Sequence, residues 1–295
     1  MMKVQGILTI TVCLLLCLTG CAGRGQTETA SPGESPPAGN AGLLDRADSQ
    51  QEPDSFAPTD QMAEPFTTST SILDVIDNPH FALMDPTYTF SVPKKQMASG
   101  SFDILSHIME TYFSEPNEDN VSDDIMEALM RSVIRNLRVA MDNPEDYTAR
   151  SNLMWDSTMA ENRLIKMGKK CDFECHNMEY QLGAYTNCNH GCGLAVIQPV
   201  YYRHIYKEGL PKFVRFAENV WGIARDGKTD EELALAGIDA LAAFIKELSL
   251  STTLKELGAD KAQLKEIADS CGISQGSYKP MTHKEILAIF HECYE

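Results

Sequence analysis

The chain has 295 residues, of which 43% are hydrophobic and 23% charged, a globular composition that is too polar for a protein with many membrane spans. At roughly 100–200 residues per domain, this length accommodates one large domain or two ordinary ones. It holds 42 acidic and 25 basic residues, a formal net charge of −17, and because phosphate binding needs a basic surface, we expect no nucleic-acid partner.

The N-terminus has the pattern of an export signal. Lys3 precedes an apolar run over residues 7–18, which is too short to cross a membrane but typical of a signal peptide. The run leads into LTGC, which ends at Cys21 and resembles the lipobox of bacterial lipoproteins. We expect residues 1–20 to be a signal peptide and the protein to be exported and anchored to the outer face of the cell membrane through lipid on Cys21. The alternative is an ordinary signal peptide with an incidental cysteine.

Residues 21–65 are rich in Pro, Gly, Ser, Gln and acidic side chains, and they show no apolar periodicity. Such a segment cannot bury enough apolar surface to offset the entropy that is lost on ordering. We therefore expect a disordered tether between the membrane and a domain that comprises residues 66–295.

Within that domain, the prolines and β-rich residues of the segment DPTYTFSVP, residues 85–93, predict a strand or a loop. From Lys94 onward, apolar residues at helical spacing and polar residues at the expected ends predict a series of helices. These helices cover residues 97–114, 121–141, 145–167, 173–186, 191–208, 211–223, 229–248, 260–270 and 282–294. Strands and helices do not alternate, so the predicted fold class is mainly α, without a parallel α/β nucleotide domain.

The first candidate site is the pair Asp103 and His107. Their spacing of four residues places both on one face of the helix predicted over residues 97–114. A carboxylate and an imidazole on one face can ligate a divalent metal ion. The same spacing also occurs in surface ion pairs, and a histidine can simply belong to the core, so the spacing alone leaves both readings open.

The second candidate is a stretch rich in cysteine and histidine. Its possible ligands are Cys171, Cys175, His176, Cys188, His190 and Cys192. Thiolates and imidazoles suit Zn²⁺, although these spacings are not those of the common zinc modules. Exported cysteines could pair as disulfides instead, and the state of these four cysteines, and of Cys271 and Cys293, is open.

Two motifs resemble those of the iron-containing alcohol dehydrogenases, specifically the butanol dehydrogenase-like branch. The first is NPHFALMDPTYTFSVPKKQMASGSFDILSHIMETYFS, and its ordered landmarks are Asp85, Pro93, Gly100, Asp103, His107 and Glu110. The second is CHNMEYQLGAYTNCNHGCGLAVIQPVYYRHIY. The resemblance covers about residues 76–295 and implies a helical bundle similar to the C-terminal domain of that family.

In that family, the helical domain supplies one aspartate and three histidines to a single Fe²⁺ or Zn²⁺, and a separate α/β domain binds NAD(P)H. Matched by position, Asp103, His107 and His190 take the places of three ligands. Tyr180 stands where the remaining histidine is expected, and His176 matches a family histidine one turn before it. The resemblance thus implies a weakened metal site, because a phenol must lose a proton to bind well.

The resemblance does not extend to the nucleotide domain, since residues 1–100 contain no glycine-rich phosphate loop. Three functions are therefore open. In the first, the chain is a truncated, lipid-anchored relative that keeps a metal pocket without autonomous redox activity. In the second, it is a working half of an oxidoreductase, and a nucleotide-domain partner or a homo-oligomer supplies the NAD(P)H site. In the third, it is a metal-free binding or scaffold lipoprotein. The absent phosphate loop favours the first and third.

Overall fold

The computed structural model of this protein describes residues 82–295. The predictions of a signal peptide over residues 1–20, of lipid on Cys21, of a tether over residues 21–65 and of a domain that starts at residue 66 lie outside the described residues. Within the described part, no helix is both long and apolar enough to cross a membrane.

Every regular element between residues 82 and 295 is helical, which confirms the mainly α class for this part of the chain. In chain order the elements are η1 (Pro86–Thr89), α3 (Lys94–Tyr112), α4 (Val121–Asp142), α5 (Tyr147–Glu161), α6 (Glu174–Thr186), α7 (His190–Ile205), α8 (Leu210–Arg215), the π-helical turn η2 (Phe216–Val220), α9 (Asp230–Glu247), η3 (Lys261–Gln263), α10 (Leu264–Ser270) and α11 (His283–Glu292).

Two local predictions are corrected by the structure. Residues 85–93, expected to be a strand or a loop, contain no strand and begin with the 3-10 turn η1, because Asp85 accepts a hydrogen bond from the Thr87 N–H and Pro86 suits a first helical position. The helix expected over residues 145–167 ends at Glu161, since the backbone turns left-handed at Arg163 with φ 70°. The residues between α5 and α6 therefore form a connecting segment, and this segment contacts α3 where the Asp172 N–H donates to the Glu110 backbone oxygen.

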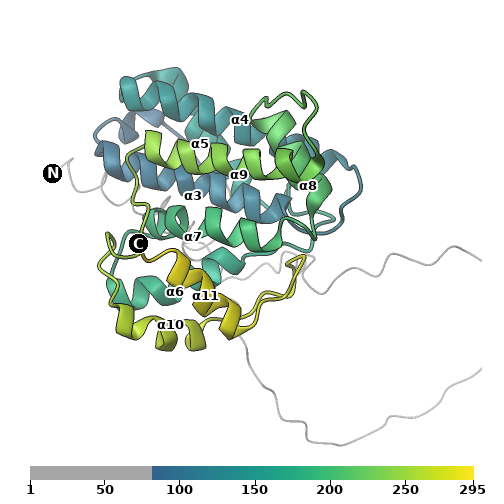
Figure 1. Ribbon diagram of the computed structural model, residues 1–295. Helices are drawn as coiled ribbons and strands as arrows, with labels where there is room; N and C mark the ends of the chain where they lie inside the picture. Colours follow the sequence, from purple (N-terminus) through teal and green to yellow (C-terminus); the bar gives the residue numbers. More distant parts are fainter. Residues whose placement is uncertain (1–81) are drawn as a thin grey trace, which may run out of the picture. The chain divides into compact units, whose positions relative to one another are not determined.

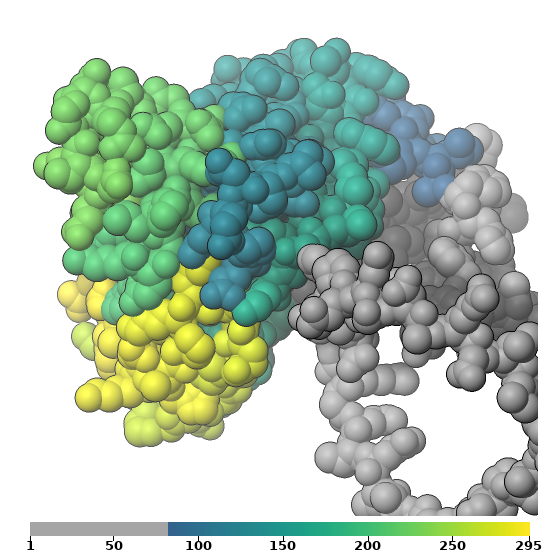
Figure 2. All heavy atoms as spheres, turned by 90° about the vertical axis from the view of Figure 1, so that its right-hand side faces the viewer, coloured from purple at the N-terminus to yellow at the C-terminus, as the bar shows by residue number. Residues whose placement is uncertain are grey.

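Helix α3 occupies the centre of the fold (Figure 1) and buries 13 of its 19 residues, as expected of a helix that is surrounded by others. It packs against α4 and α5 on one side and against α7 on the other. Helix α7 in turn contacts α6 and α11, while α10 packs on α11 and α6. The yellow C-terminal residues lie below the green ones on the face shown in Figure 2, and Met84–Glu295 belong to one compact unit.

The start of α7 lies unusually close to α3, and a glycine makes this possible. A Cβ atom on Gly191 would lie 2.1 Å from the backbone oxygen of Ser99, so a larger residue would push the two helices apart. Asn189 caps α7 by accepting the Cys192 N–H, and its side chain also receives the hydroxyl of Ser99. These contacts hold His190, the first residue of α7, against the middle of α3.

Candidate metal centre

Four side chains converge where α3, α6 and α7 meet. Asp103 and His107 lie one turn apart on α3, His176 lies in the first turn of α6, and His190 begins α7. The Nε2 atoms of the three histidines lie 3.5–3.6 Å from Asp103 Oδ1. Those of His107 and His176 are 3.2 Å apart. Ligand atoms of Asp103, His107 and His176 all lie within 4.8 Å of one another, and His190 joins this group through Asp103.

The structure brings together the three expected ligands and adds His176, which the sequence analysis had placed beside the site. Tyr180, expected at the remaining ligand position, instead stacks its ring on that of His190 with centroids 5.5 Å apart. A signal in the sequence pointed to His176, since a neutral imidazole is a better ligand for a divalent ion than a phenol. Four side chains thus converge where the sequence analysis expected three ligands, and metal binding itself stays a prediction.

Asp103 provides the test of whether these residues suit a cation. Its Oδ1 atom is buried and has no hydrogen-bond partner, because imidazole nitrogens at 3.5–3.6 Å are too distant for good hydrogen bonds. Buried polar atoms are rarely left unpaired. One carboxylate oxygen facing three imidazole nitrogens is a donor set that suits Zn²⁺ or Fe²⁺. The residues present therefore fit the ion that the resemblance implies.

Exposure and charge are uneven across the cluster. The side chains of His107 and His176 are 2% and 1% exposed, whereas those of Asp103 and His190 are 15% and 19% exposed, so the cluster opens to solvent on their side. Burial alone raises the pKa of Asp103, but the imidazoles of His176 and His190 outweigh it and hold that pKa below its usual range. Burial lowers the pKa of His190, yet Asp103 and Glu179 raise it to about 9. Protons and cations therefore compete for these side chains.

The second ring nitrogen of each histidine faces a glutamate. Nδ1 of His107 lies 2.5 Å from Glu161, Nδ1 of His176 contacts Glu110, and Nδ1 of His190 contacts Glu179. Of these glutamates, the sequence analysis singled out only Glu110, as a landmark. Glu179 carried no signal for its contact with His190, which lies on the next helix. Glu161 carried none either, because it enters from the end of α5.

The cysteines take no part in this cluster. All six between residues 82 and 295 are free thiols, so no disulfide joins them. In the same range, the only group of three potential ligand atoms brought close together is that of Asp103, His107 and His176. The alternative of a cysteine-rich zinc site thus finds no support among the described residues.

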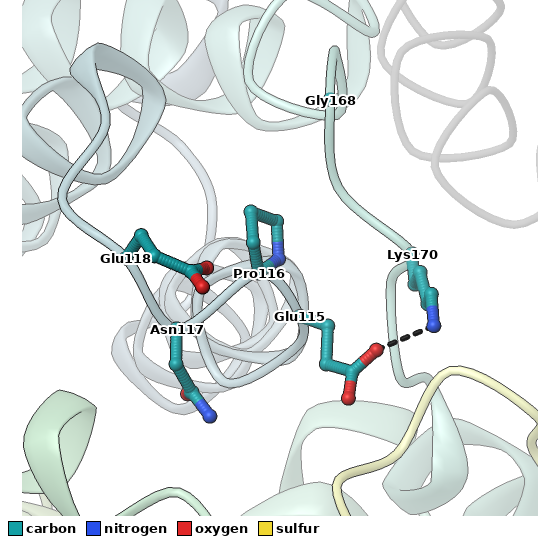
Figure 3. A pocket seen from close by; sticks show the side chains of 6 residues that line it. All are labelled: Glu115, Pro116, Asn117, Glu118, Gly168 and Lys170. Carbon is teal, nitrogen blue, oxygen red and sulfur yellow. Dashed lines mark hydrogen bonds and ion pairs between the residues drawn. The ribbon is translucent and has the colours of Figure 1, made fainter.

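A surface hollow of about 350 Å³ is lined by other residues (Figure 3). Lys170 forms an ion pair with Glu115 at its edge. The complete lining is Glu115, Pro116, Asn117, Glu118, Gly168 and Lys170. It contains none of the converging side chains and is not part of the candidate site.

The chain is similar in sequence to a known protein family and to several characterised or probable dehydrogenases. Residues 97–294 match the model of a family described as Fe-containing alcohol dehydrogenase, C-terminal. The chain is 39% identical over 221 residues to NADH-dependent butanol dehydrogenase A of Clostridium acetobutylicum, covering 73% of this chain and 57% of that protein. It is 33% identical to a probable NADH-dependent butanol dehydrogenase of Bacillus subtilis, covering 72% and 55%.

Solved structures of proteins named as butanol dehydrogenase and aldehyde reductase also resemble this chain. The NADH-dependent butanol dehydrogenase A of Thermotoga maritima superposes with a TM-score of 0.67 at 29% identity, covering 72% of this chain and 55% of that one. The aldehyde reductase YqhD of Escherichia coli superposes with a TM-score of 0.68 at 28% identity, covering 74% and 58%. The chain thus spans little more than half the length of these relatives.

Proposed function

The chain belongs to the Fe-containing alcohol dehydrogenase family, and from this membership we propose that residues 82–295 form the metal-binding half of an NAD(P)H-dependent alcohol or aldehyde oxidoreductase. The observation that carries the proposal is the buried, unpaired Oδ1 of Asp103, which faces three imidazole nitrogens. In a metal-free scaffold this oxygen would keep only the ion pairs at 3.5–3.6 Å and no hydrogen bond, and a missing hydrogen bond costs roughly 1–3 kcal/mol.

Asp103, His107, His176 and His190 would hold the ion, Fe²⁺ or Zn²⁺. When bound, the ion supplies a Lewis acid that polarises the oxygen of an alcohol or aldehyde. His107 and His176 are buried and fix the inner side of the site. Asp103 and His190 border its open side, where a substrate oxygen has access. The relatives named as butanol dehydrogenases and aldehyde reductase suggest a short-chain alcohol or aldehyde as the substrate class.

Hydride transfer also requires a nicotinamide ring held against the substrate carbon. The described residues contain neither a parallel sheet nor a strand-to-helix phosphate loop, and these are the features that bind a dinucleotide. We therefore propose that the nucleotide comes from outside residues 82–295, on a nucleotide-domain partner or a second copy, and that this domain alone has no NAD(P)H-dependent activity.

Metal analysis of the purified protein tests the proposal. We expect one Fe²⁺ or Zn²⁺ per chain by elemental analysis and calorimetry, and loss of the ion in His176→Ala and His190→Ala. The matched control is His204→Ala, at a histidine of α7 that pairs with Glu292 outside the cluster, and this variant should keep the ion. If the wild-type chain binds no metal, the proposal fails and the metal-free scaffold function replaces it.

Localisation is a separate proposal, supported by the LTGC sequence that follows the apolar run. We propose that lipid on Cys21 anchors the exported protein to the cell membrane, which would take more than one acyl chain. Cys21→Ala should release the protein from the membrane fraction or leave an unprocessed precursor. Unchanged fractionation and unchanged precursor size would contradict the anchor.

A further inference from the structure

Three buried or half-buried glutamates surround the candidate metal centre, one for each histidine, and they come from three different helices. Glu110 lies on α3, Glu161 ends α5, and Glu179 lies on α6. The Nδ1 atom of each imidazole faces one of these carboxylates. The contacts of His176 with Glu110 and of His190 with Glu179 are hydrogen bonds, whereas His107 and Glu161 form an ion pair without hydrogen-bond geometry. A carboxylate at Nδ1 favours the proton on that nitrogen and leaves the lone pair of Nε2 available for a metal ion.

Glu110 combines this contact with a second one. Helix α6 has no side-chain cap of its own, because its N-cap residue is Phe173 in a left-handed conformation. The carboxylate of Glu110 accepts the backbone N–H groups of Cys175 at 2.6 Å and His176 at 3.3 Å, and it thereby caps the helix together with Asp172, which accepts the Glu174 N–H at 3.3 Å. The same carboxylate contacts Nδ1 of His176. Glu110 thus fixes both the backbone and the ring of one candidate ligand.

Glu179 owes its position to a glycine on the neighbouring helix. Its carboxylate contacts Nδ1 of His190 and receives the thiol of Cys188 at 3.7 Å. A Cβ atom on Gly193 would lie 2.6 Å from both Cγ and Oε1 of Glu179, closer than real Cβ atoms approach. Gly193 therefore provides the space in which Glu179 reaches from α6 to the first residue of α7.

Glu161 is the most accessible of the three, with a side chain that is 19% exposed. One of its oxygens lies 2.5 Å from His107 Nδ1, and the other lies 3.4 Å from Lys166 Nζ. Lys166 also lies over the ring of Phe173 at 4.8 Å. That ring packs against the imidazole of His107 at 5.6 Å. The segment that follows α5 thereby contacts His107, one of the two buried candidate ligands.

We propose that Glu110, Glu161 and Glu179 are positioning residues of this metal centre, each holding one imidazole so that its Nε2 faces Asp103. The inference rests on the proposed function, because it concerns the same ion. It goes further by assigning a dedicated carboxylate to every histidine and a packing role to Gly193. These residues act through the ligands and are not ligands themselves.

Co²⁺ is the probe for this inference, because its visible absorption reports ligand geometry as well as occupancy. We expect Glu179→Gln and Glu161→Gln to bind Co²⁺ about 10–100-fold more weakly than the wild type, as is typical when an outer partner of a metal ligand is lost. The absorption bands should also shift, which a loss of stability alone would not cause. Glu247→Gln, the same change at an exposed ion pair with Arg138, is the matched control and should behave as the wild type.

A second variant tests the inference without altering any charge. Gly193→Ala should displace Glu179 and weaken Co²⁺ binding by about 10-fold or more, by the same loss of an outer partner. Gly100→Ala is its control, since a Cβ atom there meets nothing within 4 Å. Wild-type affinity and spectrum in Glu179→Gln, Glu161→Gln and Gly193→Ala would overturn the positioning role while leaving the proposed function intact. A wild-type chain that binds no Co²⁺, Zn²⁺ or Fe²⁺ would overturn both.

Discussion

His176 and Tyr180 lie one turn apart on α6, and the difference between them determines the composition of the candidate site. His176 is buried, with Nε2 3.6 Å from Asp103 Oδ1. The Tyr180 ring stacks on the ring of His190. An imidazole binds a divalent ion without losing its single ring proton, whereas a phenol has to ionise. We therefore expect the histidine to be the ligand in this position and the tyrosine to form part of the wall around it.

A pair of substitutions separates these roles. Tyr180→Phe should still bind Zn²⁺, because the ring that stacks on His190 is retained and the expected ligand is His176. His176→Ala should lower it by more than the roughly 10–100-fold that is typical of losing an outer partner. Titration calorimetry on the purified protein measures both. A large loss in Tyr180→Phe together with full binding in His176→Ala would return Tyr180 to the ligand set.

Asp156 allows a test that is independent of the metal. It is 3% exposed and its Oδ2 atom has no hydrogen-bond partner. Burial raises its pKa to about 6, although Ser132 and Arg135 oppose this shift. Because its pKa in the folded state exceeds the usual value, the folded state binds more protons between about pH 4 and pH 6. This carboxyl group therefore makes the protein less stable as the pH rises through that window.

The isosteric substitution Asp156→Asn should remove that dependence. At pH 7.5 we expect the variant to have a free energy of unfolding higher by on the order of 1–3 kcal/mol, with the difference disappearing near pH 4. Urea unfolding in the presence of a chelator, at intervals from pH 4 to pH 7.5, gives the comparison. A difference that is constant over this range would mean that Asp156 does not titrate in it.

Parts of the candidate site were predictable from single residues and parts were not. Asp103 and His107 share one helix face, so their meeting follows from local spacing alone. The approach of His176 and His190 depends on how α6 and α7 pack on α3, and only the family resemblance pointed to it. Glu161 lies at the end of α5, and no periodicity in the sequence predicts its contact with His107. Ligand side chains on a single helix can be predicted from their spacing in the sequence. A site whose side chains come from several helices can be predicted only once the packing of those helices is known.

At the scale of elements, the helices followed from apolar periodicity and end signals. The extended segment was misassigned because prolines and β-rich residues suggested a strand, while the Asp85 side chain could cap a short turn instead. Nothing in the sequence other than Gly191 indicated the close contact between α3 and α7. Gly191 lies where its absent Cβ would meet the carbonyl oxygen of Ser99 at 2.1 Å. Backbone on both sides of this contact leaves little room for relaxation.

Gly191→Ala should therefore separate the two helices. We expect the free energy of unfolding to fall by about 1–3 kcal/mol or more, as is typical of overpacking, and Zn²⁺ binding to weaken because His190 moves away from Asp103. Gly100→Ala, on the open part of α3, should change neither quantity by a comparable amount. Urea unfolding and calorimetry report the two effects. An unchanged Gly191→Ala variant would show that the helices adjust at no cost.

For the molecule as a whole, the candidate ligands connect segments that are distant in sequence. Asp103 and His107 come from the central helix, while His176 and His190 follow after α4 and α5 have intervened. A cation held by all four would link α3, α6 and α7 in the folded state, and the unfolded chain has no such preformed site. Metal binding is therefore expected to stabilise the fold itself, whatever substrate or nucleotide the protein meets.

The size of this stabilisation follows from mass action. At a free Zn²⁺ concentration about 100 times the dissociation constant, a ligand that binds only the folded state adds about 2.7 kcal/mol. For a domain of about 200 residues, this corresponds to a rise in Tm of roughly 5–10 °C. We expect that rise in thermal unfolding of the wild type, its reversal by EDTA, and its absence in the double variant His107→Ala/His190→Ala. If Zn²⁺ leaves the Tm of the wild type unchanged, the four side chains hold no ion. If the Tm rises equally in the wild type and the double variant, the ion binds elsewhere, because only an ion held by these histidines links the three helices.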